Sequence, residues 1–173
     1  MHALILLSLL AATTNYDLIV DDLVADTQRA AAAYKMLSNA GVGAFPALLK
    51  RLDDQTIIEN GNFQEARVNG SSGKLTKPRL GRVAFCLIQS QIEDTWPKSI
   101  RDYHALTEQN IVEWLNTYQG ESLGELRIHA LSVSLESVSN DISKTECTKQ
   151  KVDALEFLVK KLKIEIAHQF KKQ

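Results

Sequence analysis

Six side chains suited to catalysis or recognition fall within the segment 94–107 of the sequence: Trp96, Lys98, Arg101, Asp102, Tyr103 and His104. An Asp and a His close together are the residue types of general acid–base chemistry, and Glu93 adds a second carboxylate just before the segment. However, the sequence holds no GxSxG, P-loop or GxGxxG pattern to accompany them. A small hydrolase that uses Asp102 and His104, with Glu93, is therefore an alternative and not the first hypothesis.

The same segment favours recognition of another protein. Trp, Tyr and Arg are the residue types that contribute most to binding energy at protein interfaces. We therefore predict that the partner-binding residues are Trp96, Lys98, Arg101, Tyr103 and His104. The alternative is that Trp96 and Tyr103 turn inward and hold the segment against the core.

A metal or cofactor site is not expected. Glu125 and His129 are four residues apart in a helical pattern, so both can point the same way. A metal site needs three or four ligands, and no third ligand accompanies this pair. We expect an intrahelical Glu–His contact here, and the sequence predicts neither a metal nor a cofactor.

The two cysteines, Cys86 and Cys147, fit neither a metal-binding spacing nor a CxxC redox motif. Pairing of Cys86 with His104 as a catalytic dyad is unfavourable, because Cys86 lies in the most apolar segment of the chain. In an oxidising compartment the two cysteines are a candidate disulfide. In the cytosol they would be one buried thiol and one loop thiol.

The first residues bear on the compartment. Ala3 to Ala12 is an apolar run with only Ser8 polar, too short to span a bilayer but of the length of a signal-peptide core. Ala11 and Thr13 then occupy the −3 and −1 positions of a cleavage site, although no Lys or Arg precedes the run. We predict a signal peptide at 1–13 and a periplasmic or secreted protein. The alternative is a cytoplasmic protein whose first helix docks on the core.

Composition indicates one globular domain over residues 14–173, without an integral membrane span. The sequence has 173 residues, of which 45% are hydrophobic and 24% charged, and its net charge of −1 argues against nucleic acid as the main partner. Residues 1–147 carry 13 basic and 18 acidic side chains, a balance of −5, whereas residues 148–173 carry seven and three, a balance of +4. The final basic helix is either a solvated face or a contact surface for an acidic partner or membrane.

Apolar residues at intervals of three and four predict an all-α fold of five to six helices stacked as antiparallel hairpins. The expected helices cover residues 17–38, 45–52, 82–93, 107–119, 122–138 and 148 onwards. The segment 82–93 is apolar on all sides from Val83 to Ile88 and should form a central buried helix, with a buried strand as the alternative that periodicity leaves open. Turn-forming residues interrupt the helical pattern at 55–80, where a small β-hairpin insertion near 60–80 is expected.

One unit of this pattern resembles a HEAT-type helical repeat. The residues that carry the resemblance are Leu37, Gly41, Ala44, Pro46, Leu48, Leu52 and Asp53. It implies that the apolar positions pack one helix pair on the next and that the aspartate lies in a turn. No regular period continues through the chain, so a single unit is expected and not a solenoid. The longer stretch from 44 to 131 also resembles small bacterial helical proteins to which no activity is assigned.

These observations predict a non-enzymatic protein-binding module that presents the loops 55–80 and 94–107 on a helical scaffold. Its partner is another protein. The more specific alternative is a periplasmic immunity protein that inhibits a toxin of competing bacteria, such as a cell-wall hydrolase, by inserting a loop into the enzyme's cleft. The hydrolase described above is the second alternative.

Overall fold

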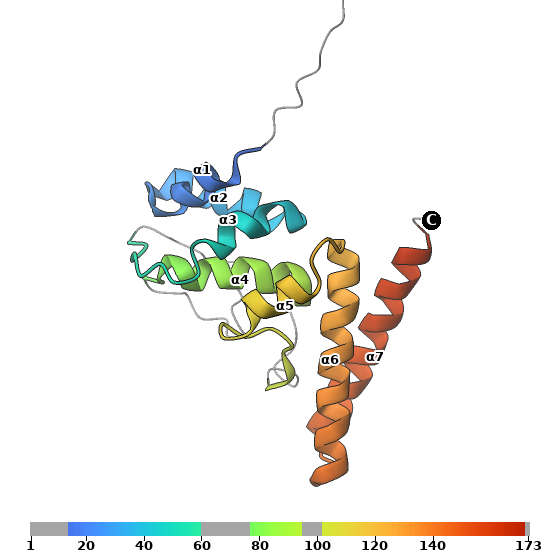
Figure 1. Ribbon diagram of the computed structural model, residues 1–173. Coiled ribbons are helices and arrows are strands. Elements are labelled where there is room, and N and C mark those ends of the chain that lie inside the picture. The colour runs from blue at the N-terminus through green and yellow to red at the C-terminus, as the bar shows by residue number, and fades with distance from the viewer. Residues whose placement is uncertain (1–13, 60–76, 95–101, 172–173) are drawn as a thin grey trace, which may run out of the picture.

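The computed structural model describes residues 14–59, 77–94 and 102–171, and these residues form an all-α fold (Figure 1). This confirms the predicted class, although the described residues form seven α-helices where five or six were expected. The helices are α1 (Tyr16–Asp21), α2 (Thr27–Ser38), α3 (Phe45–Leu49), α4 (Leu80–Glu93), α5 (Ile111–Thr117), α6 (Leu123–Lys144) and α7 (Lys149–Phe170). Short 3-10 helices cover Asp22–Val24 and Gly41–Ala44.

Helix α4 is the centre of the main core. Twelve of its residues are buried, because α2 and α3 pack on one side of it and α6 crosses near its C-terminal end (Figure 1). The buried residues include Val83, Leu87 and Ile88, which leave no polar stripe of the kind that a surface helix shows. The prediction of a central helix over 82–93 is therefore confirmed.

The predicted helix over 17–38 is interrupted. Helix α1 ends at Asp21, a 3-10 turn follows, and α2 begins at Thr27. The Asp26 carboxylate accepts hydrogen bonds from the backbone N–H groups of Gln28 and Arg29, both at 3.0 Å, and so caps α2. The three-to-four-residue spacing of apolar side chains continues across this break, because the tight turn leaves Leu23 buried in the core.

The HEAT-like stretch forms the end of α2, a turn and α3. Gly41 adopts a φ of 65°, a left-handed conformation that favours glycine, and Pro46 lies in the first turn of α3. Helix α3 ends at Leu49, earlier than the expected Leu52. The assignment of this unit to the HEAT type stays a prediction.

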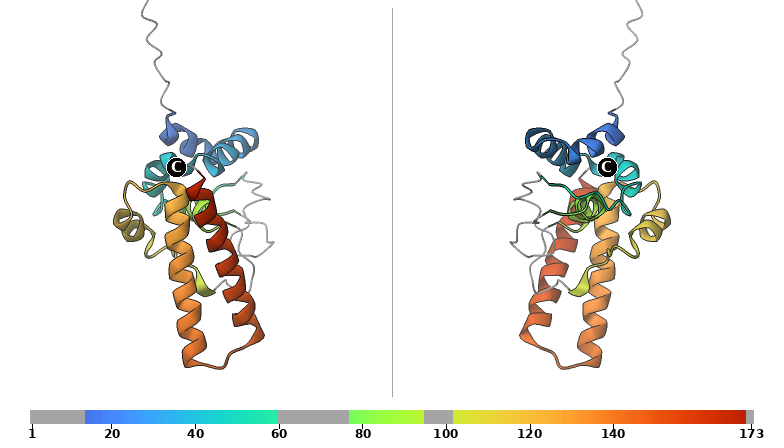
Figure 2. Two further views of the ribbon diagram at one scale, coloured as in Figure 1. Left: turned by 90° about the vertical axis from the view of Figure 1, so that its right-hand side faces the viewer. Right: turned by 90° about the vertical axis from the view of Figure 1, so that its left-hand side faces the viewer.

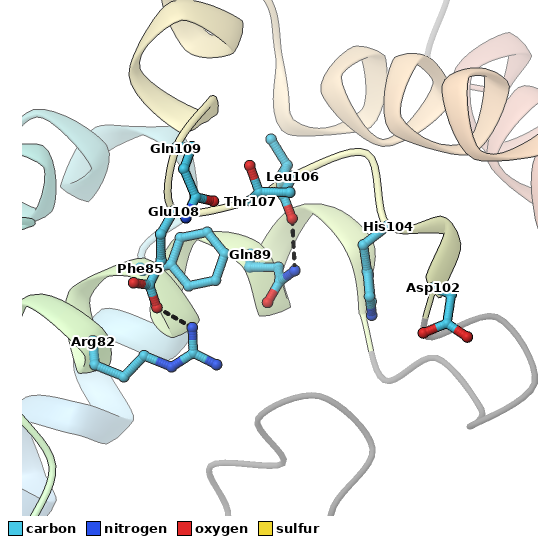
Figure 3. Close-up of a pocket in the computed structure, with 9 residues that line it drawn as sticks. All are labelled: Arg82, Phe85, Gln89, Asp102, His104, Leu106, Thr107, Glu108 and Gln109. Atoms are coloured by element: carbon cyan, nitrogen blue, oxygen red, sulfur yellow. Dashed lines mark hydrogen bonds and ion pairs between the residues drawn. The ribbon is translucent and has the colours of Figure 1, made fainter. Parts of the chain in front are cut away.

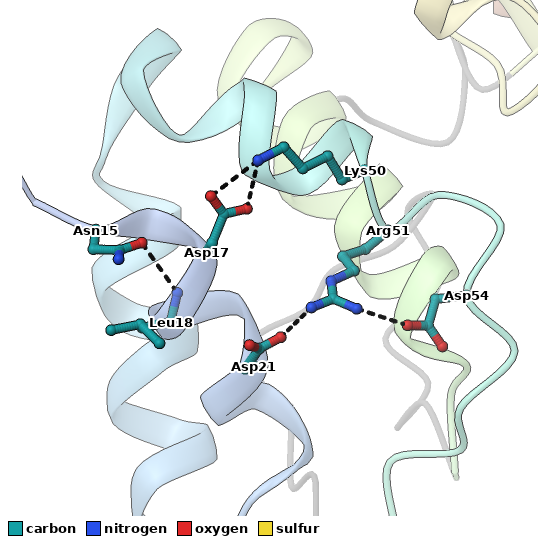
Figure 4. A network of polar contacts seen from close by, with 7 residues as sticks. All are labelled: Asn15, Asp17, Leu18, Asp21, Lys50, Arg51 and Asp54. Carbon is teal, nitrogen blue, oxygen red and sulfur yellow. Dashed lines mark hydrogen bonds and ion pairs between the residues drawn. The ribbon is translucent and has the colours of Figure 1, made fainter.

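Ion pairs hold α1 against the end of α3 (Figure 4). Lys50 Nζ lies 2.9 Å from a carboxylate oxygen of Asp17, and Arg51 pairs with both Asp21 and Asp54. These side chains are partly exposed, so the contribution of each pair to stability is small. Two basic side chains at the end of α3 therefore face three carboxylates, those of Asp17, Asp21 and Asp54.

The two ends of the 55–80 segment lie side by side. An isolated antiparallel bridge joins Ile57 and Arg79, and the N–H groups of Ile58 and Leu80 donate to the carbonyls of Pro78 and Thr56, both at 2.9 Å. No strand forms among the described residues. The predicted β-hairpin falls mainly on residues 60–76, which lie outside the described residues.

Helices α6 and α7 form a long antiparallel hairpin that extends past α4 (Figure 1). The predicted capping box is present, because Ser122 and Glu125 exchange hydrogen bonds at the start of α6. A separate small core lies between the two helices and consists of Leu131, Val138, Ala154 and Leu158. The hairpin is therefore partly independent of the main core.

The candidate disulfide between Cys86 and Cys147 does not form in this structure, in which both cysteines are free thiols. Cys86 is buried on α4, and burial raises the pKa of its thiol to about 12. Cys147 is exposed in the connection between α6 and α7, at the end of the hairpin. The two thiols lie in different parts of the fold, so the spacing in the sequence does not translate into proximity.

Within the described residues, none of the helices combines the length and apolar character needed to cross a membrane. The predicted signal peptide at 1–13 lies outside the described residues.

Candidate functional site

The predicted binding residues divide into two groups. Trp96, Lys98 and Arg101 lie outside the described residues. Tyr103 and His104 lie in a segment that runs along α4 from residue 102 to the start of α5. Both side chains are half-buried, and each makes a specific polar contact with a neighbouring helix.

A buried carboxylate at the end of α4 fixes this segment. The side chain of Glu93 has no exposed surface, although a carboxylate is costly to bury without partners. Its Oε2 lies 2.6 Å from Nδ1 of His104, and its Oε1 accepts a hydrogen bond of 2.9 Å from the backbone N–H of Leu106. Each carboxylate oxygen therefore holds one point of the segment.

Further side-chain amides complete the attachment. Gln89, one turn before Glu93 on α4, donates to the carbonyl of Leu106 at 3.1 Å. Asn110 donates to the carbonyl of Ala105 at 2.8 Å and exchanges hydrogen bonds with Thr107. Helix α5 consequently begins at Ile111. The sequence predicted an earlier start, with Thr107 as the N-cap.

Tyr103 links the segment to α6. Its hydroxyl donates to Oδ2 of Asp141 at 2.5 Å, and Lys151 of α7 lies 3.1 Å from the same oxygen. The ring packs beside the small core of the hairpin. Tyr103 therefore points inward, as the alternative interpretation expects for this residue.

This contact makes a pH dependence measurable. The hydrogen bond to Asp141, together with burial, raises the pKa of Tyr103 from its ordinary value of 10 to about 12. Because the pKa is higher in the folded chain, the stabilisation is complete below pH 10 and is lost as the pH rises towards 12. In an ultraviolet titration, we expect one of the four tyrosines to ionise late in the folded protein. Tyr103→Phe should remove that late step and lose less stability over the same pH range, and an unchanged titration in this variant would contradict the assignment.

An open pocket lies between α4 and the segment (Figure 3). Its volume is about 440 Å³. Figure 3 shows His104 and Asp102 at one end and the ion pair of Arg82 with Glu108 at the other, with Gln89 between them. The remaining lining residues are Phe85, Leu106, Thr107 and Gln109.

The charges of the pocket favour a ligand group that donates hydrogen bonds. Glu108 is paired with Arg82, whereas Asp102 is exposed and forms no ion pair among the described residues. A Lys, Arg or amide group that enters beside Asp102 would find an acceptor there. The backbone on that side of the pocket is already fixed by Glu93, so binding requires little ordering of the chain.

The predicted contact between Glu125 and His129 is replaced by another arrangement. Glu125 bonds to Ser122 in the capping box, and His129 stacks on Tyr118, with ring centroids 4.1 Å apart. Nε2 of His129 lies 3.0 Å from a carboxylate oxygen of Glu121. No group of three or more potential metal ligands occurs among residues 14–59, 77–94 and 102–171.

Comparison with family models, curated proteins and solved structures finds no match for this chain. The function must therefore be inferred from the geometry of the site.

The sequence suggested Asp102, His104 and Glu93 as one catalytic group. In the structure, His104 contacts Glu93, and His104 and Asp102 line the same pocket. Sequence reasoning missed Arg82, Gln89 and Glu108. A signal for Gln89 was present, because Gln89 and Glu93 are polar residues four apart in a helix whose run Val83–Ile88 is wholly apolar. Polar residues on a buried face indicate partners elsewhere in the chain.

Proposed function

We propose that this chain is a protein-binding module and that the pocket between α4 and residues 102–109 is the centre of its binding surface. The single observation that supports this proposal is the attachment of the segment to the buried Glu93. Such an attachment presents polar side chains in one fixed arrangement, which is the property that specific binding needs.

The partner in this proposal inserts a basic or amide side chain into the pocket beside Asp102. The loop 94–107 supplies Asp102 and His104 to the pocket, and the loop 55–80, which precedes α4 in the sequence, would widen the contact area. Lysine, arginine and amide groups are matched to the pocket because each donates several hydrogen bonds.

The test compares the same substitution, Gln to Arg, at a position inside the pocket and at a position away from it. Gln109 lines the pocket, whereas Gln150 is exposed on α7, away from the pocket. We expect Gln109→Arg to obstruct the pocket and to weaken binding at least about tenfold, a loss of about 1.4 kcal/mol. Gln150→Arg should bind like the wild type.

The measurement has two stages. The partner is first captured from the native lysate with each of the three proteins as bait, and its affinity is then measured by calorimetry with purified components. Equal affinity of the wild type and both variants would contradict the assignment of the pocket. Absence of a stoichiometric partner would contradict the binding function itself.

The contact between Glu93 and His104 supports a second candidate function, hydrolysis. In this candidate, His104 is the general base and Glu93 orients its imidazole, while Asp102 lies at the same pocket. His104→Asn keeps a donor near the position of Nδ1 but removes the base. With p-nitrophenyl acetate as the probe, wild-type turnover that is lost in His104→Asn would support this candidate. Equal rates in the two proteins would reject it.

The proposal includes export, with residues 1–13 as the signal and Thr14 as the first residue of the mature chain. Mass spectrometry of the exported protein reads its N-terminus directly. A mature chain that begins at Met1 would contradict export by this signal.

A further inference from the structure

The pocket between α4 and residues 102–109 lies on a side of α4 that α2 and α3 leave open. The right view of Figure 2 looks along α4 and shows α2 and α3 above it and α5 to one side. The lining comes from α4 and from the residues that lead into α5. A side chain of another protein can therefore enter the pocket without displacing α2 or α3.

The charges of the lining favour a ligand with a single positive charge. At one end, Arg82 is paired with Glu108, and its guanidinium also lies over the ring of Phe85, 5.2 Å from the ring centroid. At the other end, the carboxylate of Asp102 forms no ion pair among the described residues. The ligand therefore has one carboxylate to neutralise, whereas an anion would find the arginine of the lining already paired.

Gln89 supplies a second acceptor, and the orientation of this acceptor is fixed. The side-chain Nε2 of Gln89 donates to the carbonyl of Leu106 at 3.1 Å, and a carbonyl oxygen can only accept. The amide is therefore oriented with Oε1 away from Leu106, as Figure 3 shows. Oε1 accepts no hydrogen bond from any of the described residues. A well-matched ligand therefore donates to this amide oxygen as well as to the carboxylate of Asp102.

The guanidinium group of arginine has enough donors for both acceptors. It carries five N–H groups in a planar fork, and two of them can bond to the two oxygens of one carboxylate. The N–H groups that remain can donate to Oε1 of Gln89. The ammonium group of lysine is a point charge whose donors all lie on one nitrogen, so it serves separated acceptors less well. A neutral amide lacks the charge that Asp102 requires.

We propose that the pocket binds an arginine side chain of the partner protein. Asp102 neutralises the charge of this arginine, and Gln89 distinguishes arginine from lysine. The guanidinium lies beside the imidazole of His104, which Glu93 holds in place and which Figure 3 shows between Gln89 and Asp102. Because the arginine belongs to the partner, its assignment rests on the proposed function and narrows the inserted side chain to one residue type.

The test uses three capped tripeptides with glycine on each side of a central arginine, lysine or citrulline. Citrulline has the length of arginine without its charge. Each peptide is titrated into the full chain, and binding is followed by NMR through the backbone amide signals of residues 102–109. We expect the arginine peptide to bind at least about tenfold more tightly than the other two, which is the effect of about one hydrogen bond to a charged group.

Two aspartates provide matched variants for the charge. Asp102 and Asp53 are both exposed and form no ion pair among the described residues, but only Asp102 lines the pocket. Asp102→Asn removes the charge and keeps the shape, so it should weaken binding of the arginine peptide at least about tenfold. Asp53→Asn should bind this peptide like the wild type.

A third variant tests the role of Gln89. Gln89→Met keeps the length of the side chain and removes the acceptor. Binding through Asp102 should remain, but the arginine and lysine peptides should then bind with equal affinity. Because the comparison is made within one variant, a general loss of affinity does not affect it, and circular dichroism establishes that the helices are retained.

Free L-arginine separates two sources of the same group. Its carboxylate gains nothing from Arg82, which is already paired with Glu108. Free arginine should therefore bind no more tightly than the capped arginine peptide. Tighter binding of the free amino acid would assign the pocket to a small molecule and would overturn the proposal.

Three other results would also overturn it: no binding of the arginine peptide, equal affinity for the three peptides, or equal affinity of Asp102→Asn and Asp53→Asn for the arginine peptide. An undiminished preference for arginine in Gln89→Met would remove Gln89 from the assignment. All of these outcomes are distinct from failure of the proposed function, because capture of the partner and its loss in Gln109→Arg are measured without the peptides.

Discussion

Replacing Glu93 with alanine is expected to lower the free energy of unfolding by about 3–5 kcal/mol, the combined cost of the cavity and of a buried hydrogen-bond donor left without its acceptor. The side chain of Glu93 has no exposed surface, and its two oxygens contact Nδ1 of His104 and the N–H of Leu106. Alanine leaves that N–H without an acceptor and leaves a cavity at the end of α4. For a chain of this length, the melting temperature should fall by roughly 6–12 °C or more.

Two further variants separate the charge from the packing. Glu93→Gln keeps the volume and an acceptor for Leu106, so we expect a loss of only about 1 kcal/mol. Glu113 is an exposed glutamate on α5 without an ion pair among the described residues, and Glu113→Ala should change stability by less than about 0.5 kcal/mol. Thermal unfolding followed by circular dichroism measures all three. If Glu93→Ala melts at the same temperature as Glu113→Ala, the segment 102–106 does not depend on Glu93 for its attachment.

Gly81→Ala is expected to destabilise the protein by about 3 kcal/mol, the upper part of the usual range for overpacking. A Cβ atom at this position would lie 2.1 Å from the carbonyl oxygen of Leu52 and 3.0 Å from that of Arg51. Both atoms belong to the backbone, so the clash is relieved only if α4 moves away from the end of α3. That movement would also strain the hydrogen bond of 2.9 Å from the N–H of Gly81 to the carbonyl of Asp54.

Gly124 provides a matched control, because it also lies in the first turn of a helix. A Cβ atom there would meet the side-chain amide of Gln169, at 1.7 Å from its nitrogen. The end of a flexible, half-buried side chain can rotate away, and alanine favours the helix by up to about 1 kcal/mol over glycine. Chemical denaturation should therefore show Gly81→Ala far less stable than Gly124→Ala. Equal midpoints for the two would show that the approach of α4 to Leu52 is loose enough to accept a methyl group.

Gly81 and Glu93 lie at opposite ends of α4, and together they explain how this helix organises the fold. At its start, the absence of a side chain lets α4 begin directly against the end of α3. At its end, a buried carboxylate holds the segment that lines the pocket. The apolar residues between them form the core, so the same helix positions both the N-terminal helices and the candidate site.

The sequence by itself determined where most helices lie. The apolar run at 82–93 predicted the central helix, Ser122 and Glu125 predicted the start of α6, and Thr148 predicted that of α7. These signals are local, because helical periodicity and caps depend on residues within a few positions of one another. Gly41 and Gly120 likewise both adopt the positive φ that their place at a helix end implies.

Only the tertiary structure decided which polar residues meet. Glu93 contacts His104 and Leu106, 11 and 13 positions away, and Tyr103 contacts Asp141, 38 positions away. Such pairs depend on the path of the backbone between them, which helical periodicity does not determine. The break before Asp26 shows the same limit, because one apolar spacing fits both a continuous helix and two helices with a tight turn. The choice between them rests on burial of Leu23 against the rest of the core, a long-range interaction that the local pattern does not contain.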